Sequence, residues 1–197
     1  MKNFYKNLEK KLLKFCPDIN KKKILDGNSL QSASLILLFE GKNGISFFLT
    51  KRSKNLKSHP GQISLPGGKA ELFDKNFGET ARRETEEEIG IPESKMKHLG
   101  YLPSVYTKTN YVIFPSVAIL KLNYADIMSN LKICEQEVEK VWIEPIYKFI
   151  DLKSYDKVTN KDKIYWKIES NNKIVWGATA MILNNLALII NNSFYSN

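Results

Sequence analysis

The sequence predicts a mixed α/β domain of the α+β kind, because candidate strands and helices alternate along it. Residues 34–40 (SLILLFE) and 45–50 (ISFFLT) are apolar runs of strand length. The segment 41–44 (GKNG) between them carries the Asn-Gly signal of a β-hairpin. Residues 67–91 then form a glycine turn, a polar loop and a short acidic helix that a Gly-Ile-Pro stop ends.

The rest of the chain continues this alternation. The pattern predicts a short strand before Pro66, and further strands at 97–102, 116–122, 164–168 and 173–176. The last two strands should form a hairpin across Asn171-Asn172. Helices are expected at 124–131 and 176–190. No internal repeat and no linker suggests a second globular domain.

The N-terminal segment has a separate character. Phe4, Leu8, Leu12 and Phe15 recur at helical spacing with lysines between them, so a basic amphipathic helix is expected. Such a helix can lie on a membrane or serve as an organelle signal, but docking on the domain is the favoured reading. The run 21–23 (KKK) is expected to be a solvated linker. We therefore divide the chain into a basic helix and linker (1–29) and one domain (30–190).

The location of charge bears on the partners. The formal net charge is +9, and residues 1–23 hold eight lysines against two acidic residues. Residues 67–91 instead hold four basic and seven acidic residues, so the motif-bearing segment is acidic. A second basic patch (Lys51, Arg52, Lys54 and Lys57) precedes the glycine turn and suits substrate phosphates. A small phosphorylated molecule is therefore favoured over nucleic acid as the partner.

The cysteines and the hydropathy pattern bear on the compartment. Cys16 and Cys134 are far apart and lack metal or redox spacing, which indicates free thiols in a reduced, cytoplasmic compartment. No apolar run reaches the ~18 residues that a membrane span needs. No membrane partner is therefore expected.

The acidic helix carries the chemistry. Glu84, Glu87 and Glu88 stand at i, i+3 and i+4, so their carboxylates share one face. Like charges at this spacing repel, and a hard divalent cation such as Mg²⁺ or Mn²⁺ would reverse that cost. The opposite stripe is suited to packing on a sheet and consists of Ala81, Thr85 and Ile89. A solvated acidic helix is the competing interpretation.

The surrounding spacing resembles the Nudix box, G-x5-E-x7-R-E-U-x-E-E-x-G-U. Residues 83–91 (RETEEEIGI) match its second half if Thr85 is allowed at the first apolar position. The first half departs from it, because Asp74 stands six residues after Gly68 and eight residues separate it from Arg83. That variant resembles the coenzyme A pyrophosphatase branch, whose longer loop carries acid-x-x-Asp, here Glu71 to Asp74.

A second motif supports the same branch. Residues 48–53 (FLTKRS), Lys57, Gly61 and 65–68 (LPGG) are similar to the branch signature L-L-T-x-R-[S/A]-x3-R-x3-G-x3-F-P-G-G. Phe48, Lys57 and Leu65 replace Leu, Arg and Phe. Lys57 keeps the charge of the arginine but loses the planar fork that grips phosphate.

The resemblance covers about residues 30–190 and implies a Nudix-type α/β/α sandwich on a mixed sheet. It implies metal ligation by Glu84, Glu88 and the Gly68 carbonyl. Glu87 would bind a second ion or take the proton from water, and the two roles stay open. Arg83 should orient the carboxylates. The implied reaction is hydrolysis of the diphosphate of coenzyme A or its thioesters to 3′,5′-ADP and (acyl-)4′-phosphopantetheine.

Substrate contacts are expected at Arg52, Lys51 and Lys57 for the phosphates, and at Gly67, where the absent side chain permits close approach. Tyr111 would stack on adenine or pack in the core. ADP-ribose or NADH is the alternative substrate, and a non-catalytic nucleotide- or RNA-binding protein is the alternative class. The oligomeric state stays open, with a homodimer as one option.

Four further residues are assigned roles. Glu137 is the first choice for an additional ligand or base, although an exposed strand face fits it equally well. Asn110 occupies a position where the branch carries glycine, and asparagine tolerates positive φ. His59 is expected to be a loop residue without chemistry, and His98 a sheet-surface residue.

Overall fold

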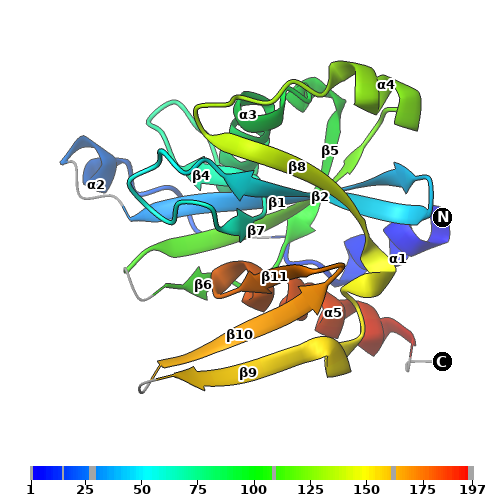
Figure 1. Ribbon diagram of the computed structural model, residues 1–197. Helices are drawn as coiled ribbons and strands as arrows, with labels where there is room; N and C mark the ends of the chain where they lie inside the picture. Colours follow the sequence, from blue (N-terminus) through cyan, green and yellow to red (C-terminus); the bar gives the residue numbers. More distant parts are fainter. Residues whose placement is uncertain (1, 15, 27–29, 108–109, 161–162, 195–197) are drawn as a thin grey trace.

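The computed structural model describes residues 2–14, 16–26, 30–107, 110–160 and 163–194. A mixed β-sheet forms the centre, with helices on both of its faces (Figure 1). Helices α3 (Phe77–Ile89) and α4 (Tyr124–Asn130) cover one face. Helix α5 (Ala178–Phe194) and a small antiparallel sheet cover the other. The predicted α/β/α sandwich is confirmed.

The described residues contain an eight-stranded central sheet in which β3, β2, β1, β7 and β5 lie side by side. Strand β4 pairs with β1, β6 with β7 and β8 with β2. Among the described strands of this sheet, β1 and β7 form the only parallel pair. The strands are β1 (Gln31–Gly41), β2 (Gly44–Arg52), β3 (Ile63–Ser64), β4 (Gly67–Lys69), β5 (Met96–Tyr101), β6 (Val105–Tyr106), β7 (Val112–Leu120) and β8 (Val138–Pro145).

The small sheet contains β9 (Tyr155–Asn160), β10 (Lys163–Ser170) and β11 (Lys173–Trp176). The predicted β10–β11 hairpin is confirmed, and Asn171 and Asn172 both adopt positive φ at its turn. Strand β9 was not predicted, because its sequence YDKVTN is too short and polar to show a strand pattern. The described residues also form three short 3₁₀ helices: η1 (Glu93–Lys95), η2 (Ile146–Lys148) and η3 (Leu152–Ser154).

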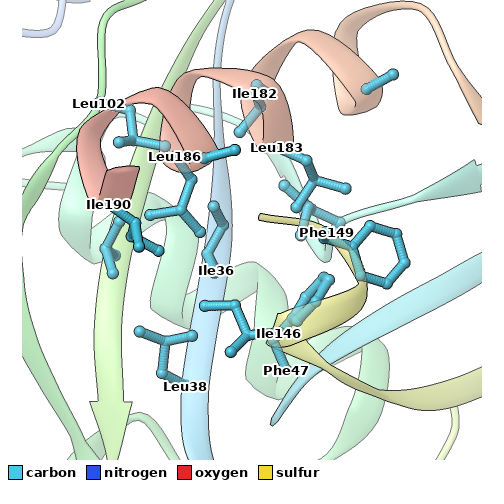
Figure 2. Close-up of a cluster of buried hydrophobic side chains, with 14 of the residues drawn as sticks. Ile36, Leu38, Phe47, Leu102, Ile146, Phe149, Ile182, Leu183, Leu186 and Ile190 are labelled. Carbon is cyan, nitrogen blue, oxygen red and sulfur yellow. The ribbon is translucent and has the colours of Figure 1, made fainter. Parts of the chain in front are cut away.

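Strand alternation divides the interior into two cores. Ile36 and Leu38 of β1 face α5, where they meet Leu186 (Figure 2). Leu35 and Leu37 point the other way and pack in the core beneath α3. Because β1 is covered on both faces, its sequence is a continuous apolar run instead of an alternating one.

The N-terminal helix α1 (Lys2–Lys11) docks on the domain as expected. Leu8 and Leu12 are buried in the same core as α5. Leu13 pairs with Tyr101 through two backbone hydrogen bonds, which form an isolated antiparallel bridge alongside β5. Phe15 lies outside the described residues. The expected linker at 21–23 is instead the start of a short helix, α2 (Lys21–Leu25), although its three lysines are exposed.

Two predictions about single residues have different outcomes. Asn110 adopts φ +62°, which confirms the conformation expected there. His98 is not a sheet-surface residue, because its ring is half-buried and its Nε2 is buried without a hydrogen-bond partner among the described residues. No helix within the described ranges is long and apolar enough to cross a membrane.

Candidate functional site

Helix α3 presents the acidic residues from a well-defined frame. The Asn76 side chain caps its start by accepting a hydrogen bond from the Glu79 N–H at 3.0 Å. Gly90 ends it in the left-handed conformation, with φ +75°. The predicted sheet-facing stripe is confirmed, since its members are fully buried: Ala81, Thr85 and Ile89. Packing of this stripe fixes the rotation of the helix and hence the direction of its glutamates.

Arg83 is the hub of the site. Its guanidinium reaches Glu84 at 3.0 Å and Glu87 at 2.8 Å through Nη1. Nε and Nη2 each lie 3.1 Å from one oxygen of Asp74. Nη2 also donates to the Lys69 carbonyl at 2.9 Å. The arginine therefore joins two glutamates of α3 to the loop before the helix.

Asp74 belongs to the framework of the loop. Its buried carboxylate accepts hydrogen bonds from the Glu71 N–H at 2.9 Å and the Thr80 hydroxyl at 2.8 Å, besides the two from Arg83. Burial opposes ionisation, but these hydrogen bonds outweigh it and hold the pKa of Asp74 below its usual value. Asp74 therefore remains an anion that anchors Arg83.

Glu84 and Glu88 are unusually buried acids. Burial raises the pKa of Glu84 to about 7, with Arg83 opposing the shift and Glu87 adding to it. Burial also raises the pKa of Glu88 to about 8, and the nearby Glu84 charge adds to the shift while Arg52 opposes it. Glu88 is only 3% exposed, and its Oε2 accepts a long 3.4 Å hydrogen bond from the Gly67 N–H. Two such neighbours need positive charge to remain ionised together.

The two glycines of β4 permit close approaches to two different groups. A Cβ on Gly68 would overlap the Glu84 carboxylate. A Cβ on Gly67 would overlap the backbone of Ala33, and its φ of +150° also disfavours a side chain. Gly67 therefore lets β4 approach β1, and Gly68 leaves room for Glu84.

A fourth glutamate reaches the site from the distant loop that precedes β8. The Lys132 N–H and the Cys134 N–H bond the Ile89 and Glu88 carbonyls at 2.9 and 3.0 Å, which seats this loop on the end of α3. Glu137 follows, and its charge further raises the pKa values of Glu84 and Glu88. Its carbonyl also accepts from the Ser53 N–H at 2.8 Å.

We tested whether these groups fit a divalent cation. Within the described ranges, no three His, Cys, Asp or Glu side chains are already gathered around one point. The Arg83 guanidinium instead holds Glu84 and Glu87. The chemistry of the donor set nevertheless fits a hard cation, since the buried Glu88 and the largely buried Glu84 are acids of like charge beside the two glycines of β4. Glu84, Glu88 and Gly68 are the residues that could hold it.

The predicted phosphate-binding residues differ in their surroundings. Arg52 is half-buried and acts electrostatically on Glu88. Lys51 is engaged in an ion pair with Glu139 at 2.6 Å. Lys57 is exposed on the loop between β2 and β3, as is His59, which agrees with the loop position expected for the histidine. Of these three basic residues, Arg52 is the one whose charge acts on the Glu88 carboxylate.

Tyr111 directly precedes β7 and is half-buried. The Lys69 ammonium stands 5.8 Å from the centre of its ring. Because Lys69 belongs to β4 next to Gly68, Tyr111 is close to the acidic centre in the fold. Its ring is neither a free stacking surface nor part of the fully buried core.

Comparisons with known proteins agree with this geometry. The NUDIX domain model matches residues 29–161. Nudix hydrolase 22, chloroplastic, of Arabidopsis thaliana is 36% identical over 169 residues, which cover 81% of this chain and 55% of the plant protein. The Nudix hydrolase NudL of Photorhabdus laumondii is 32% identical over 84% of this chain and 87% of its own length. The chain thus spans about half of the plant relative.

A solved structure shows the same fold. The MutT protein from Methanosarcina mazei Go1 superposes with a TM-score of 0.51 and 18% identity, over 84% of this chain and 96% of that one. At this identity the likeness concerns the fold alone.

Proposed function

The chain belongs to the Nudix hydrolase family, and on that premise we propose that it is a divalent-metal-dependent pyrophosphatase. The observation that carries the proposal is the position of Glu84 and Glu88 next to the Gly-Gly pair of β4, with Glu88 3% exposed and the Glu84 side chain 14% accessible. Isolated buried carboxylates are costly, and a bound cation offsets that cost. Glu84, Glu88 and the Gly68 carbonyl are the proposed ligands for Mg²⁺ or Mn²⁺.

When bound, the cation supplies charge neutralisation for the diphosphate oxygens and acidifies the attacking water. Arg83 has a positioning role, because its guanidinium is occupied by Asp74, Glu84 and Glu87. The charge of Arg52 acts on Glu88, and we assign to Arg52 the positive charge that receives a substrate phosphate. The chain's own contribution is therefore the set of acids that Arg83 positions, together with the positive charge of Arg52.

Two residues compete for the role of general base. Glu87 is the more exposed of the α3 acids, with 54% of its side chain accessible, so it can reach solvent and substrate. Glu137 is placed beside Glu84 and Glu88 by the loop seated on the end of α3. We propose Glu87 as base or second-ion ligand and Glu137 as an additional acid of the centre.

The proposed substrate is coenzyme A or one of its thioesters, cleaved to 3′,5′-ADP and (acyl-)4′-phosphopantetheine. The support is the resemblance of residues 48–53 and 65–68 to the coenzyme A branch, together with the position of Arg52. Lys57 is exposed and available for the 3′-phosphate, whereas Lys51 must first leave Glu139 to contact substrate.

The decisive experiment is a mass-spectrometric product assay with coenzyme A, acetyl-coenzyme A, ADP-ribose and NADH, each with Mg²⁺, with Mn²⁺ and with chelator. We expect metal-dependent release of 3′,5′-ADP from coenzyme A. A lower kcat/KM for dephospho-coenzyme A would show that the 3′-phosphate is recognised. Cleavage of ADP-ribose or NADH alone would contradict the substrate but not the metal chemistry.

The variant Glu87→Gln separates catalysis from folding. It should keep the unfolding midpoint of the parent and lose most of the turnover. The matched control is Glu86→Gln, which lies on the same helix and is exposed. Full activity of Glu87→Gln would remove Glu87 from the mechanism. If the protein binds RNA in a salt-sensitive way and hydrolyses none of the four compounds, the proposed enzymatic function is wrong and the chain is a binding protein.

A further inference from the structure

The small sheet carries an aromatic surface that the chemistry above does not use. Tyr165 of β10 and Trp176 of β11 contact each other with ring centres 5.8 Å apart and planes at 65°. Trp176 is 42% exposed, although tryptophan is costly to leave in water. On the same strand Ile174 is 49% exposed.

Strand alternation places this surface on the outer side of the small sheet. Ile168 and Val175 form a cross-strand pair and are both buried against α5. The neighbouring pair, Lys167 with Trp176, must therefore face away from that core. The aromatic rings do not support the core, and the small sheet would keep its buried face without them.

The strand that carries Trp176 lies beside β3, which leads into the proposed metal site. Gly177 directly follows Trp176, and a Cβ on Gly177 would lie 3.8 Å from the side-chain amide nitrogen of Gln62. Gln62 precedes β3, and its backbone carbonyl accepts a hydrogen bond from the backbone N–H of Arg52 at 3.0 Å. Three residues after the end of β3, the Gly67 N–H donates to Oε2 of Glu88 at 3.4 Å. The segment from Gln62 to Gly67 therefore connects the neighbourhood of the rings with the buried glutamate.

We propose that Trp176 and Tyr165 form a platform on which the nucleobase of the substrate stacks while its diphosphate occupies the Arg52 and glutamate end. This inference rests on the proposed function and adds the residues that recognise the base. A flat, exposed indole offers a π-face to a base, and the edge contact of Tyr165 holds its orientation. Lys167, directly opposite Trp176, adds a cation beside the platform.

The test measures binding instead of turnover, so that it does not depend on the identity of the full substrate. The full chain is titrated calorimetrically in Mg²⁺ with ADP and with inorganic pyrophosphate, which lacks a base. Trp176→Ala should weaken ADP binding about tenfold and leave pyrophosphate binding unchanged. Trp176→Phe should restore most of the ADP affinity. The matched control is Tyr147→Ala, which removes another exposed aromatic ring, 57% accessible, on η2 after β8.

Other outcomes overturn the platform. Unchanged ADP affinity in Trp176→Ala does so directly. If that variant also converts a dimer into a monomer in sedimentation, the surface joins two copies of the chain instead. Equal affinity of the parent for ADP and pyrophosphate would leave the diphosphate site in place and exclude recognition of the base. Failure of the parent to bind either compound would contradict the proposed function as well.

Discussion

Arg83 and Asp74 form a two-point ion pair, with Nε and Nη2 of the arginine each 3.1 Å from one carboxylate oxygen. The Asp74 side chain is only 3% accessible and that of Arg83 16%, so the pair is largely shielded from water. The pair fixes the plane of the guanidinium, and Nη1 is thereby aimed at Glu84 and Glu87.

Removal of Asp74 should therefore destabilise the protein and disturb the site together. We expect Asp74→Ala to lower the free energy of unfolding by ~3 kcal/mol, since Arg83 and Thr80 lose a buried acceptor. Urea unfolding provides the measurement. Glu71→Ala is the matched control, because this exposed residue contributes its backbone N–H to the loop. If the Asp74→Ala protein is as stable as the control, Asp74 does not anchor Arg83 and the loop before α3 in the way that we infer.

A side chain at position 68 should interfere with Glu84. Gly68→Ala places a Cβ against the Glu84 carboxylate, and we expect kcat/KM to fall by about 10²-fold with little change in folding. The second measurement is Mn²⁺ affinity by calorimetry. In a Glu84→Ala background the extra methyl meets no carboxylate, so the further loss from Gly68→Ala should nearly vanish. An equal loss in both backgrounds would show that the clash with Glu84 is not the cause.

Divalent cations should stabilise the folded chain. A ligand at 100 times its dissociation constant adds ~2.7 kcal/mol to the free energy of unfolding, so Mg²⁺ or Mn²⁺ should raise the melting temperature and chelator should reverse the rise. Glu88→Gln should lose most of this shift because it removes a buried proposed ligand. Glu86→Gln, on the exposed side of the helix, should retain it. A shift that survives in Glu88→Gln would place the cation elsewhere.

His98 should make stability depend on pH. Burial, with the charges of Arg82 and Lys14, lowers its pKa from 6.5 to about 4. Between these values the unfolded chain binds a proton at His98 and the folded chain does not. The free energy of unfolding should therefore fall as the pH drops from 6.5 to 4, by ~1–3 kcal/mol.

Urea unfolding across that pH range measures the effect, and His98→Gln should flatten the profile. The matched control is His59→Gln, on the exposed loop between β2 and β3, which should keep the parent's profile. An unchanged slope in His98→Gln would assign the pH dependence to other groups.

Much of this molecule follows from local pattern. The β1–β2 hairpin, the β10–β11 turn at Asn171-Asn172, the capped acidic helix and the C-terminal helix lie where the sequence predicts them. Strand β9 escaped prediction because its polar residues become a strand only by pairing with β10. His98 was misjudged, because an alternating strand pattern does not reveal that its ring enters the layer beside α3.

The sequence by itself determined where the residues of the proposed chemistry stand, since the spacing of Gly68, Arg83, Glu84, Glu87 and Glu88 depends only on one turn and one helix. Only the tertiary structure decided what surrounds them. It buried Glu88, left 14% of the Glu84 side chain accessible, and brought the charge of Glu137 to act on both from a loop about fifty residues downstream. It also left Trp176 exposed, next to Gly177 and hence near Gln62. Periodicity reports neighbours along the chain, whereas burial and long-range electrostatics depend on which distant segments pack together.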